Sequence, residues 1–122
     1  MYVYNFGEVE LFEEESTLLT SYAYLFFVHT LCFYEQDDGD PDIVSASSGD
    51  NTIAVFRNMD HGIFCEVKEV VDDDAKGART VIAADLNGDG WLDLASASKD
   101  DDSVSWYPND GTGHFHIQGR RK

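Results

Sequence analysis

Cysteine and basic residues are scarce in this chain of 122 residues. There are 2 cysteines, too few for a disulfide framework. Lysine and arginine number 8 against 24 aspartate and glutamate residues, so the formal net charge is -16. Such a charge repels the phosphates of nucleic acid and the surface of anionic membranes, and neither is an expected partner. Cations are the natural partners of so acidic a chain.

A long hydrophobic run is also lacking. The most apolar stretch, residues 23–33, is about half of the ~20 residues that a membrane-spanning helix requires. Residues 13–15 are three glutamates where a signal peptide has basic residues, and no small-residue cleavage site follows. We therefore expect no membrane span and no signal peptide in this chain, and we interpret the stretch as a buried strand.

Local catalytic motifs are missing as well. The chain has no G-x-S-x-G elbow, no H-E-x-x-H and no phosphate-binding glycine loop. His114 and His116 would share one face of a strand, but no third zinc ligand accompanies them at a recognisable spacing. The sequence predicts a protein that is not an enzyme. It leaves open a pair of carboxylates assembled from distant residues, as in a glycosidase.

The residues that are present favour folding. Hydrophobic residues make up 43% of the chain and aromatic residues 13%, which is typical of a folded domain with one modest core. Residues 85–94, DLNGDGWLDL, carry oxygen-bearing side chains at positions i, i+2, i+4 and i+8, namely Asp85, Asn87, Asp89 and Asp93. Two glycines between them allow a tight loop, and the Trp91 carbonyl is placed to add a further oxygen. This pattern predicts a calcium site.

The residue at position 12 of this loop separates it from an EF-hand. An EF-hand requires a bidentate glutamate there, followed by a helix. The twelfth residue counted from Asp85 is Ser96, and residues 92–98 alternate as a strand does. We therefore expect a calcium loop that joins two strands.

An internal repeat dominates the chain. Residues 38–64 align without a gap with residues 89–115 at an offset of 51. Ten of the 27 positions are identical, namely Asp38, Gly39, Asp42, Ser45, Ala46, Ser47, Asp50, Asn58, Gly62 and Phe64. The chain thus holds at least two copies of one unit.

Each unit is predicted to be a four-stranded antiparallel meander. The first has strands at 31–34, 42–47, 52–58 and 64–71. The second has strands at 80–84, 92–98 and 103–107 and a truncated strand at 115–118. Alanine and serine fill the second strand of each unit and bulky residues the third, a widening that suits a propeller blade.

Residues 85–115 resemble the VCBS/FG-GAP repeat of integrin-alpha-like β-propellers. The match includes the D-x-[DN]-x-[DN]-G-x-x-D-[LI] loop, the aromatic strand and the N-D-G-x-G-x-F turn, and the wider resemblance covers roughly residues 34–117. It implies an all-β fold of two four-stranded antiparallel blades from an incomplete β-propeller. It assigns the ligand roles for Ca2+ to the predicted loop residues: Asp85, Asn87, Asp89 and Asp93, with Trp91 through its carbonyl.

The resemblance also implies a function. Proteins of this kind act as binding or adhesion modules for protein or glycan ligands, usually outside the cell, where millimolar calcium fills weak sites. The alternatives are a piece of a propeller enzyme acting on polysaccharide and a truncated gene product without independent activity. Two isolated blades would leave two apolar faces open, so we expect self-association or a need for further blades.

The first unit has a weaker version of the loop. Its ungapped counterparts of Asp85 and Asn87 are Tyr34 and Gln36, which leaves Asp38 and Asp42 as matched carboxylates. We predict a weaker second site there, or a loop without metal.

The predicted organisation has three parts. Residues 1–24 are either a remnant of a preceding blade, with a strand at 6–13, or an irregular lead-in. Residues 25–76 form the first blade and residues 77–122 the second. Cys32 and Cys65 would then lie on strands that are not neighbours, which predicts free thiols.

Overall fold

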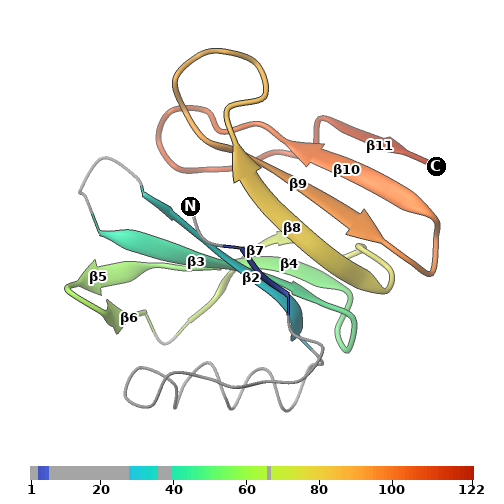
Figure 1. Cartoon of the computed structure of the whole chain (residues 1–122), viewed down its shortest axis with the longest axis horizontal. Coiled ribbons are helices and arrows are strands. Elements are labelled where there is room, and N and C mark those ends of the chain that lie inside the picture. The colour runs from blue at the N-terminus through green and yellow to red at the C-terminus, as the bar shows by residue number, and fades with distance from the viewer. Residues whose placement is uncertain (1–2, 6–27, 36–39, 66) are drawn as a thin grey trace.

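The computed structural model describes residues 3–5, 28–35, 40–65 and 67–122, and side chains are described from residue 40 onward. Every regular element in these ranges is a β-strand (Figure 1). The prediction of an all-β, antiparallel fold is confirmed. Within the same ranges no helix is long and apolar enough to cross a membrane. The strand predicted at residues 6–13 lies outside the described residues.

The first sheet has the strand order β1-β2-β3-β4-β7, and all its pairs are antiparallel. Its strands are β1 (Val3–Asn5), β2 (Val28–Glu35), β3 (Pro41–Ser47), β4 (Thr52–Phe56) and β7 (Glu69–Asp72). The sequence did not predict β1, which pairs with β2 and forms the edge of the sheet. The first unit therefore belongs to a sheet of five strands and not four.

The second sheet has four strands in the order β11-β10-β9-β8. They are β8 (Ala78–Ala84), β9 (Asp93–Ser98), β10 (Ser103–Tyr107) and β11 (Gly119–Arg121). A separate hairpin of β5 (Asn58–Asp60) and β6 (Ile63–Phe64) extends from the first sheet. The fourth strand of the first unit was predicted at 64–71. In the structure Phe64 belongs to this hairpin, and the fourth strand, β7, begins only at Glu69.

The fourth strand of the second unit also lies later than predicted. Phe115 forms an isolated bridge with Asn109, and regular pairing with β10 resumes only at Gly119, opposite Trp106. Pro108 lies on the β10 side of this pairing, between Trp106 and Asn109. It has no N–H to donate to the neighbouring segment, so the pairing is interrupted there. The strand predicted at 115–118 is thus displaced to 119–121.

The two sheets stack through their inner faces, with β8 lying against β2 and β3 (Figure 1). Cross-strand partners share a face, so one inner face carries Val44 beside Val55 and Ala46 beside Ile53. The other carries Ala83, Leu94 and Tyr107 in one row and Val81 in the next. All eight residues are completely or almost completely buried and form one core cluster.

The internal repeat is a structural repeat. Both first strands carry a register shift two residues long at their start, at Val28/Thr30 and at Ala78/Thr80. Tyr34 pairs with Asp42 in the first unit, and Ala84 pairs with Asp93 in the second. The first loop is therefore one residue shorter than the second. Glu35, and not Tyr34 as the ungapped alignment had it, is the structural counterpart of Asp85.

Cys65 follows β6 and is not in a disulfide. Since the chain has only one other cysteine, the predicted absence of a Cys32–Cys65 bridge is confirmed.

Candidate metal centre

The predicted calcium loop joins β8 to β9 and projects from the end of the second sheet, at the top of Figure 1. Residues 85–90 are all exposed. Gly88 and Gly90 have φ angles of 78° and 91°, a left-handed conformation that costs little only for glycine. Because two positions need this conformation, the glycine spacing noted in the sequence has a direct geometric reason.

The loop is held by its own side chains. Asp85 accepts hydrogen bonds from the Gly88 amide to Oδ1 at 2.8 Å and from the Gly90 amide to Oδ2 at 2.9 Å. Asn87 Oδ1 accepts one from the Asp89 amide at 3.1 Å, and Asp89 Oδ1 accepts one from the Trp91 amide at 2.9 Å. Each oxygen-bearing side chain thus turns toward the coil of the loop.

Asp93 anchors the loop to the sheet. It is completely buried at the first position of β9. Its Oδ2 accepts a hydrogen bond from the Leu86 amide at 3.1 Å, which ties the end of the loop to its start. Its Oδ1 accepts one from the Asn109 amide at 2.9 Å. The carboxylate therefore joins the loop to the turn after β10.

The chemistry of these donors fits a hard cation. Asp85, Asn87, Asp89 and Asp93 offer only oxygen atoms, the ligands that calcium prefers, and neither histidine nor cysteine is part of the loop. The structure places the four side chains on one short loop. Three of them are carboxylates, and in the described structure their oxygens do not gather around one point as the ligand atoms of a bound ion would; the loop amides hold them instead.

The equivalent carboxylate in the first unit has a different partner. Asp42 Oδ1 accepts a hydrogen bond from the Asn58 amide at 2.8 Å, as Asp93 does from Asn109. Its Oδ2 accepts one from Arg57 Nη1 at 3.0 Å. In the second unit the counterpart of Arg57 is Pro108. The Oδ2 atom of Asp42 therefore accepts a hydrogen bond from a guanidinium, whereas the Oδ2 atom of Asp93 accepts one from the Leu86 amide of the loop. Asp38 lies outside the described residues.

The asparagine after each third strand holds the next turn in the same way. Asn58 Nδ2 donates to the Pro41 carbonyl at 3.2 Å and its Oδ1 accepts from the Gly62 amide at 3.0 Å. Asn109 repeats both bonds, to the Leu92 carbonyl at 3.1 Å and from the Gly113 amide at 3.1 Å. The two identical asparagines of the repeat are therefore explained by one hydrogen-bonding role.

Arg57 also connects the two units. Its Nε donates to Glu69 Oε2 at 3.0 Å and its Nη2 to the Gly113 carbonyl of the second unit at 2.5 Å. On the same carboxylate, Glu69 Oε1 lies 3.2 Å from His114 Nδ1. These contacts tie the first sheet to the turn after β10, and sequence analysis did not identify them.

A second connection lies at the far end of the stack. Asp72 is buried and its Oδ2 accepts hydrogen bonds from the Tyr107 hydroxyl at 2.7 Å and from Arg120 Nη2 at 2.5 Å. The Tyr107 hydroxyl is also 2.9 Å from Ser96 Oγ. Burial, together with the Asp72 carboxylate, raises the pKa of Tyr107 to about 12. The network satisfies a carboxylate that would otherwise be costly to bury.

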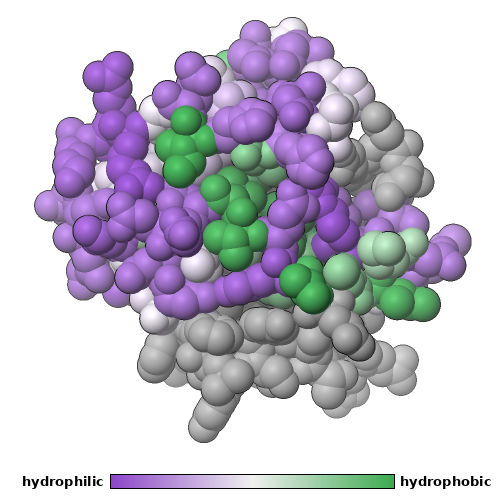
Figure 2. Space-filling view, turned by 180° about the vertical axis from the view of Figure 1, so that it is seen from behind, coloured by the Kyte–Doolittle hydropathy of each residue, from purple (hydrophilic) through white to green (hydrophobic). Residues whose placement is uncertain are grey.

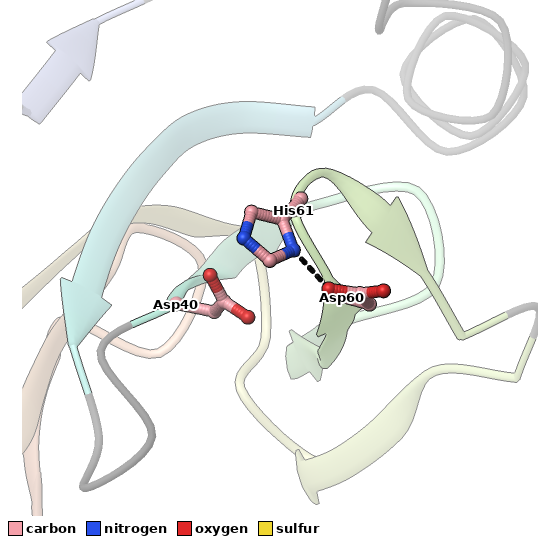
Figure 3. Close-up of side chains that lie close together, drawn as sticks. All are labelled: Asp40, Asp60 and His61. Atoms are coloured by element: carbon pink, nitrogen blue, oxygen red, sulfur yellow. Dashed lines mark hydrogen bonds and ion pairs between the residues drawn. The ribbon is translucent and has the colours of Figure 1, made fainter.

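A group of potential metal ligands that the sequence did not predict lies in the first unit. Asp40, Asp60 and His61 have ligand atoms within 4.8 Å of one another, and their side chains converge between the start of β3 and the β5–β6 turn (Figure 3). His61 Nδ1 and Asp60 Oδ1 are hydrogen-bonded to each other. The alignment contained a signal, because the counterparts of Asp40 and Asp60 are Trp91 and Gly111.

In the second unit the same place is filled by packing. A β-carbon added at Gly111 would lie 3.1 Å from Trp91 Nε1, so the indole sits directly on the glycine of the turn. The first unit has polar groups in place of this contact, the half-buried Asp40 and the exposed Asp60.

Comparison with known protein families agrees with the repeat. A model of the FG-GAP-like repeat matches residues 36–96 and again residues 85–121. No curated protein and no solved structure shows a significant match to the chain. The two matches together cover well over half of the sequence and extend from β3 to β11, including the loop between β8 and β9. The chain therefore belongs to the FG-GAP-like repeat family and contains about two of its repeats, whose sheets are of the kind that forms propeller blades.

Proposed function

We propose that this chain is a calcium-stabilised propeller repeat module that presents a binding or adhesion surface to a protein or glycan, and that it has no catalytic activity of its own. The observation that carries the proposal is the loop between β8 and β9. It offers only oxygen donors, it is exposed to solvent, and its last carboxylate, Asp93, is buried at the start of a strand. A cation bound there would connect the loop to the core of the second sheet.

The residues that would hold the ion are Asp85, Asn87, Asp89 and Asp93 through their side chains and Trp91 through its carbonyl. Calcium would supply positive charge among side chains whose like charges repel one another. The hydrogen bonds that these side chains make to loop amides give the loop a defined shape. Ion binding would then need local rearrangement of side chains and not refolding of the loop.

The surface of the molecule is strongly acidic, which suits a module that binds cations. The net charge is -16, and on the side opposite to Figure 1 most of the described surface is hydrophilic, with a few hydrophobic patches (Figure 2). Millimolar calcium outside cells fills weak sites of this type. Because proteins with repeats of this kind usually act outside the cell, we propose that the module acts at the cell surface or in the extracellular space.

Direct binding of a calcium analogue tests the proposal. Terbium binds calcium sites and emits strongly when a nearby tryptophan transfers energy to it, and Trp91 lies within the loop. Wild type should give sensitised terbium emission that calcium displaces, with one dominant site per chain. Asp89→Ala should lose the emission, while Asp73→Ala, which removes an exposed carboxylate outside the loop, should retain it.

Two results would count against this function. Emission that persists in Asp89→Ala would show that the ion binds elsewhere on the acidic surface. No displaceable emission from wild type would show that the loop is an acidic turn held by its own hydrogen bonds.

A further inference from the structure

The convergence of Asp40, Asp60 and His61 in the first unit brings together one nitrogen ligand and two oxygen ligands. One ligand atom from each residue lies within 4.8 Å of the others. Asp40 directly precedes β3, and the other two residues come from the turn that joins β5 to β6 (Figure 3). We call these three residues the mixed cluster. Within residues 40–65 and 67–122, no other three side chains of histidine, cysteine, aspartate or glutamate converge so closely.

A buried asparagine fixes the backbone on both sides of the mixed cluster. Asn58 is only 7% exposed. Its Nδ2 donates to the carbonyl of Pro41, the residue after Asp40, and its Oδ1 accepts from the amide of Gly62, the residue after His61. The two segments that carry the ligands are therefore held together by bonds in which the ligands take no part. An ion that binds there meets side chains that are already close, which lowers the entropic cost of ordering them.

The second unit has the same scaffold without the ligands. Asn109 makes the two equivalent hydrogen bonds. The counterparts of the mixed cluster there are Trp91, Gly111 and Thr112, and none of them is a histidine or an acid. The indole of Trp91 packs on the glycine instead. The repeat fold therefore does not require metal ligands at this place, and the three in the first unit stand where a packing contact could be.

The donor set of the mixed cluster differs from that of the calcium loop. Calcium takes oxygen ligands, whereas imidazole suits zinc and other late transition metals. Three side chains of the histidine and carboxylate types, with a further position open to water, are a common zinc environment. The His61 side chain is 89% exposed and that of Asp60 68%, so water can reach an ion held between them.

We infer that Asp40, Asp60 and His61 bind a zinc ion, at a site that shares no residue with the predicted calcium loop. The imidazole supplies one nitrogen and the two carboxylates supply oxygen. His61 Nδ1 and Asp60 Oδ1 are already in contact through a hydrogen bond, so the ion takes the place of the proton between them, and the proton is released to solvent. The bound ion links the start of β3 to the β5–β6 turn.

Isothermal titration calorimetry of zinc chloride into the full chain tests this inference. Millimolar calcium is present throughout, so that it occupies the sites that have only oxygen ligands. Wild type should bind one zinc ion per chain. His61→Asn and Asp40→Asn should each weaken binding at least about tenfold, because even the loss of an outer partner of a ligand costs 10–100-fold. Asparagine suits position 61, where φ is 44°.

His116→Asn is the matched control. His116 is also an exposed histidine beside an aspartate, with Nε2 3.6 Å from Asp110 Oδ2, but it lies outside the mixed cluster. This variant should keep the affinity of wild type. Near-ultraviolet circular dichroism should show that all three variants remain folded.

Proton NMR of the imidazole signals identifies the ligand independently of affinity. The signal that is missing from His61→Asn belongs to His61, and zinc should shift it in wild type more than it shifts the signal of His116. Weakened binding in both cluster variants, with the control unchanged, supports the inference. Wild type that binds no zinc overturns it, and so does zinc binding that His61→Asn leaves unchanged or that His116→Asn abolishes. An effect of His61→Asn without one of Asp40→Asn overturns the site of three ligands.

Discussion

Replacing Arg57 by methionine should destabilise the protein, because it removes a cation from a nearly buried carboxylate. The Asp42 side chain is only 4% exposed and that of Arg57 22%, and their closest atoms are 3.0 Å apart. The same guanidinium donates to Glu69 and to the Gly113 carbonyl of the second unit. Methionine retains most of the stem of the side chain and removes only these polar contacts.

The expected cost follows from the burial of the pair. Removing one partner of a fully buried ion pair costs about 3–5 kcal/mol, since the other charge stays buried without compensation. Arg57 is partly exposed, so solvent recovers part of this, and we expect a loss of about 2–3 kcal/mol. The free energy of unfolding from urea denaturation measures it. Lys99→Met, which removes an exposed positive charge from the β9–β10 turn, should cost less than about 0.5 kcal/mol.

A double-mutant cycle with Asp42→Asn tests the cause. The asparagine oxygen can still accept the hydrogen bond from the Asn58 amide, but the charge is gone. In the neutral background Arg57→Met should cost at least about 1 kcal/mol less than in wild type, because no buried charge is then left unpaired. Additive losses in the two variants, or a loss from Arg57→Met no larger than that from Lys99→Met, would refute the reasoning.

Three further predictions concern calcium, alkaline pH and backbone strain. Calcium at one hundred times its dissociation constant should add about 2.7 kcal/mol to the free energy of unfolding. Thermal denaturation in chelator and in millimolar calcium measures this gain, which Asp89→Ala should abolish and Asp38→Ala should change little. Magnesium should substitute poorly for calcium in the same assay. The raised pKa of Tyr107, about 12 in the folded protein against about 10 unfolded, means that its contribution is complete below pH ~10 and is lost as pH rises toward 12. Tyr107→Phe should lower stability at neutral pH by about 1–2 kcal/mol and flatten this alkaline loss in a urea series, and an unchanged alkaline slope would contradict the assignment. Gly77→Ala should cost more than about 1 kcal/mol, because φ is +66° and the new β-carbon would lie 2.5 Å from an aspartate side chain, whereas Gly119→Ala, with open space around it, should be nearly neutral in the same assay.

Local signals in the sequence were sufficient for the class of fold and for the repeat. Alternation of polar and apolar residues and the 51-residue offset predicted strands close to β3, β4, β9 and β10, because side-chain period and turn chemistry are properties of a few consecutive residues. The predicted loop also forms where expected, since its two glycines alone allow the left-handed backbone. Calcium binding by that loop remains a prediction.

The sequence by itself therefore determined the repeat, the strands and the candidate ligands. Tertiary structure decided which polar groups meet. Arg57 lies 56 residues from Gly113, and Asp72 lies 48 residues from Arg120; no periodicity connects them. They come together only because two sheets stack, and stacking depends on the summed burial of many apolar side chains and not on any short pattern. The same stacking decided that one face of the repeat is buried in the first unit and open in the second, where Val104 is 57% exposed.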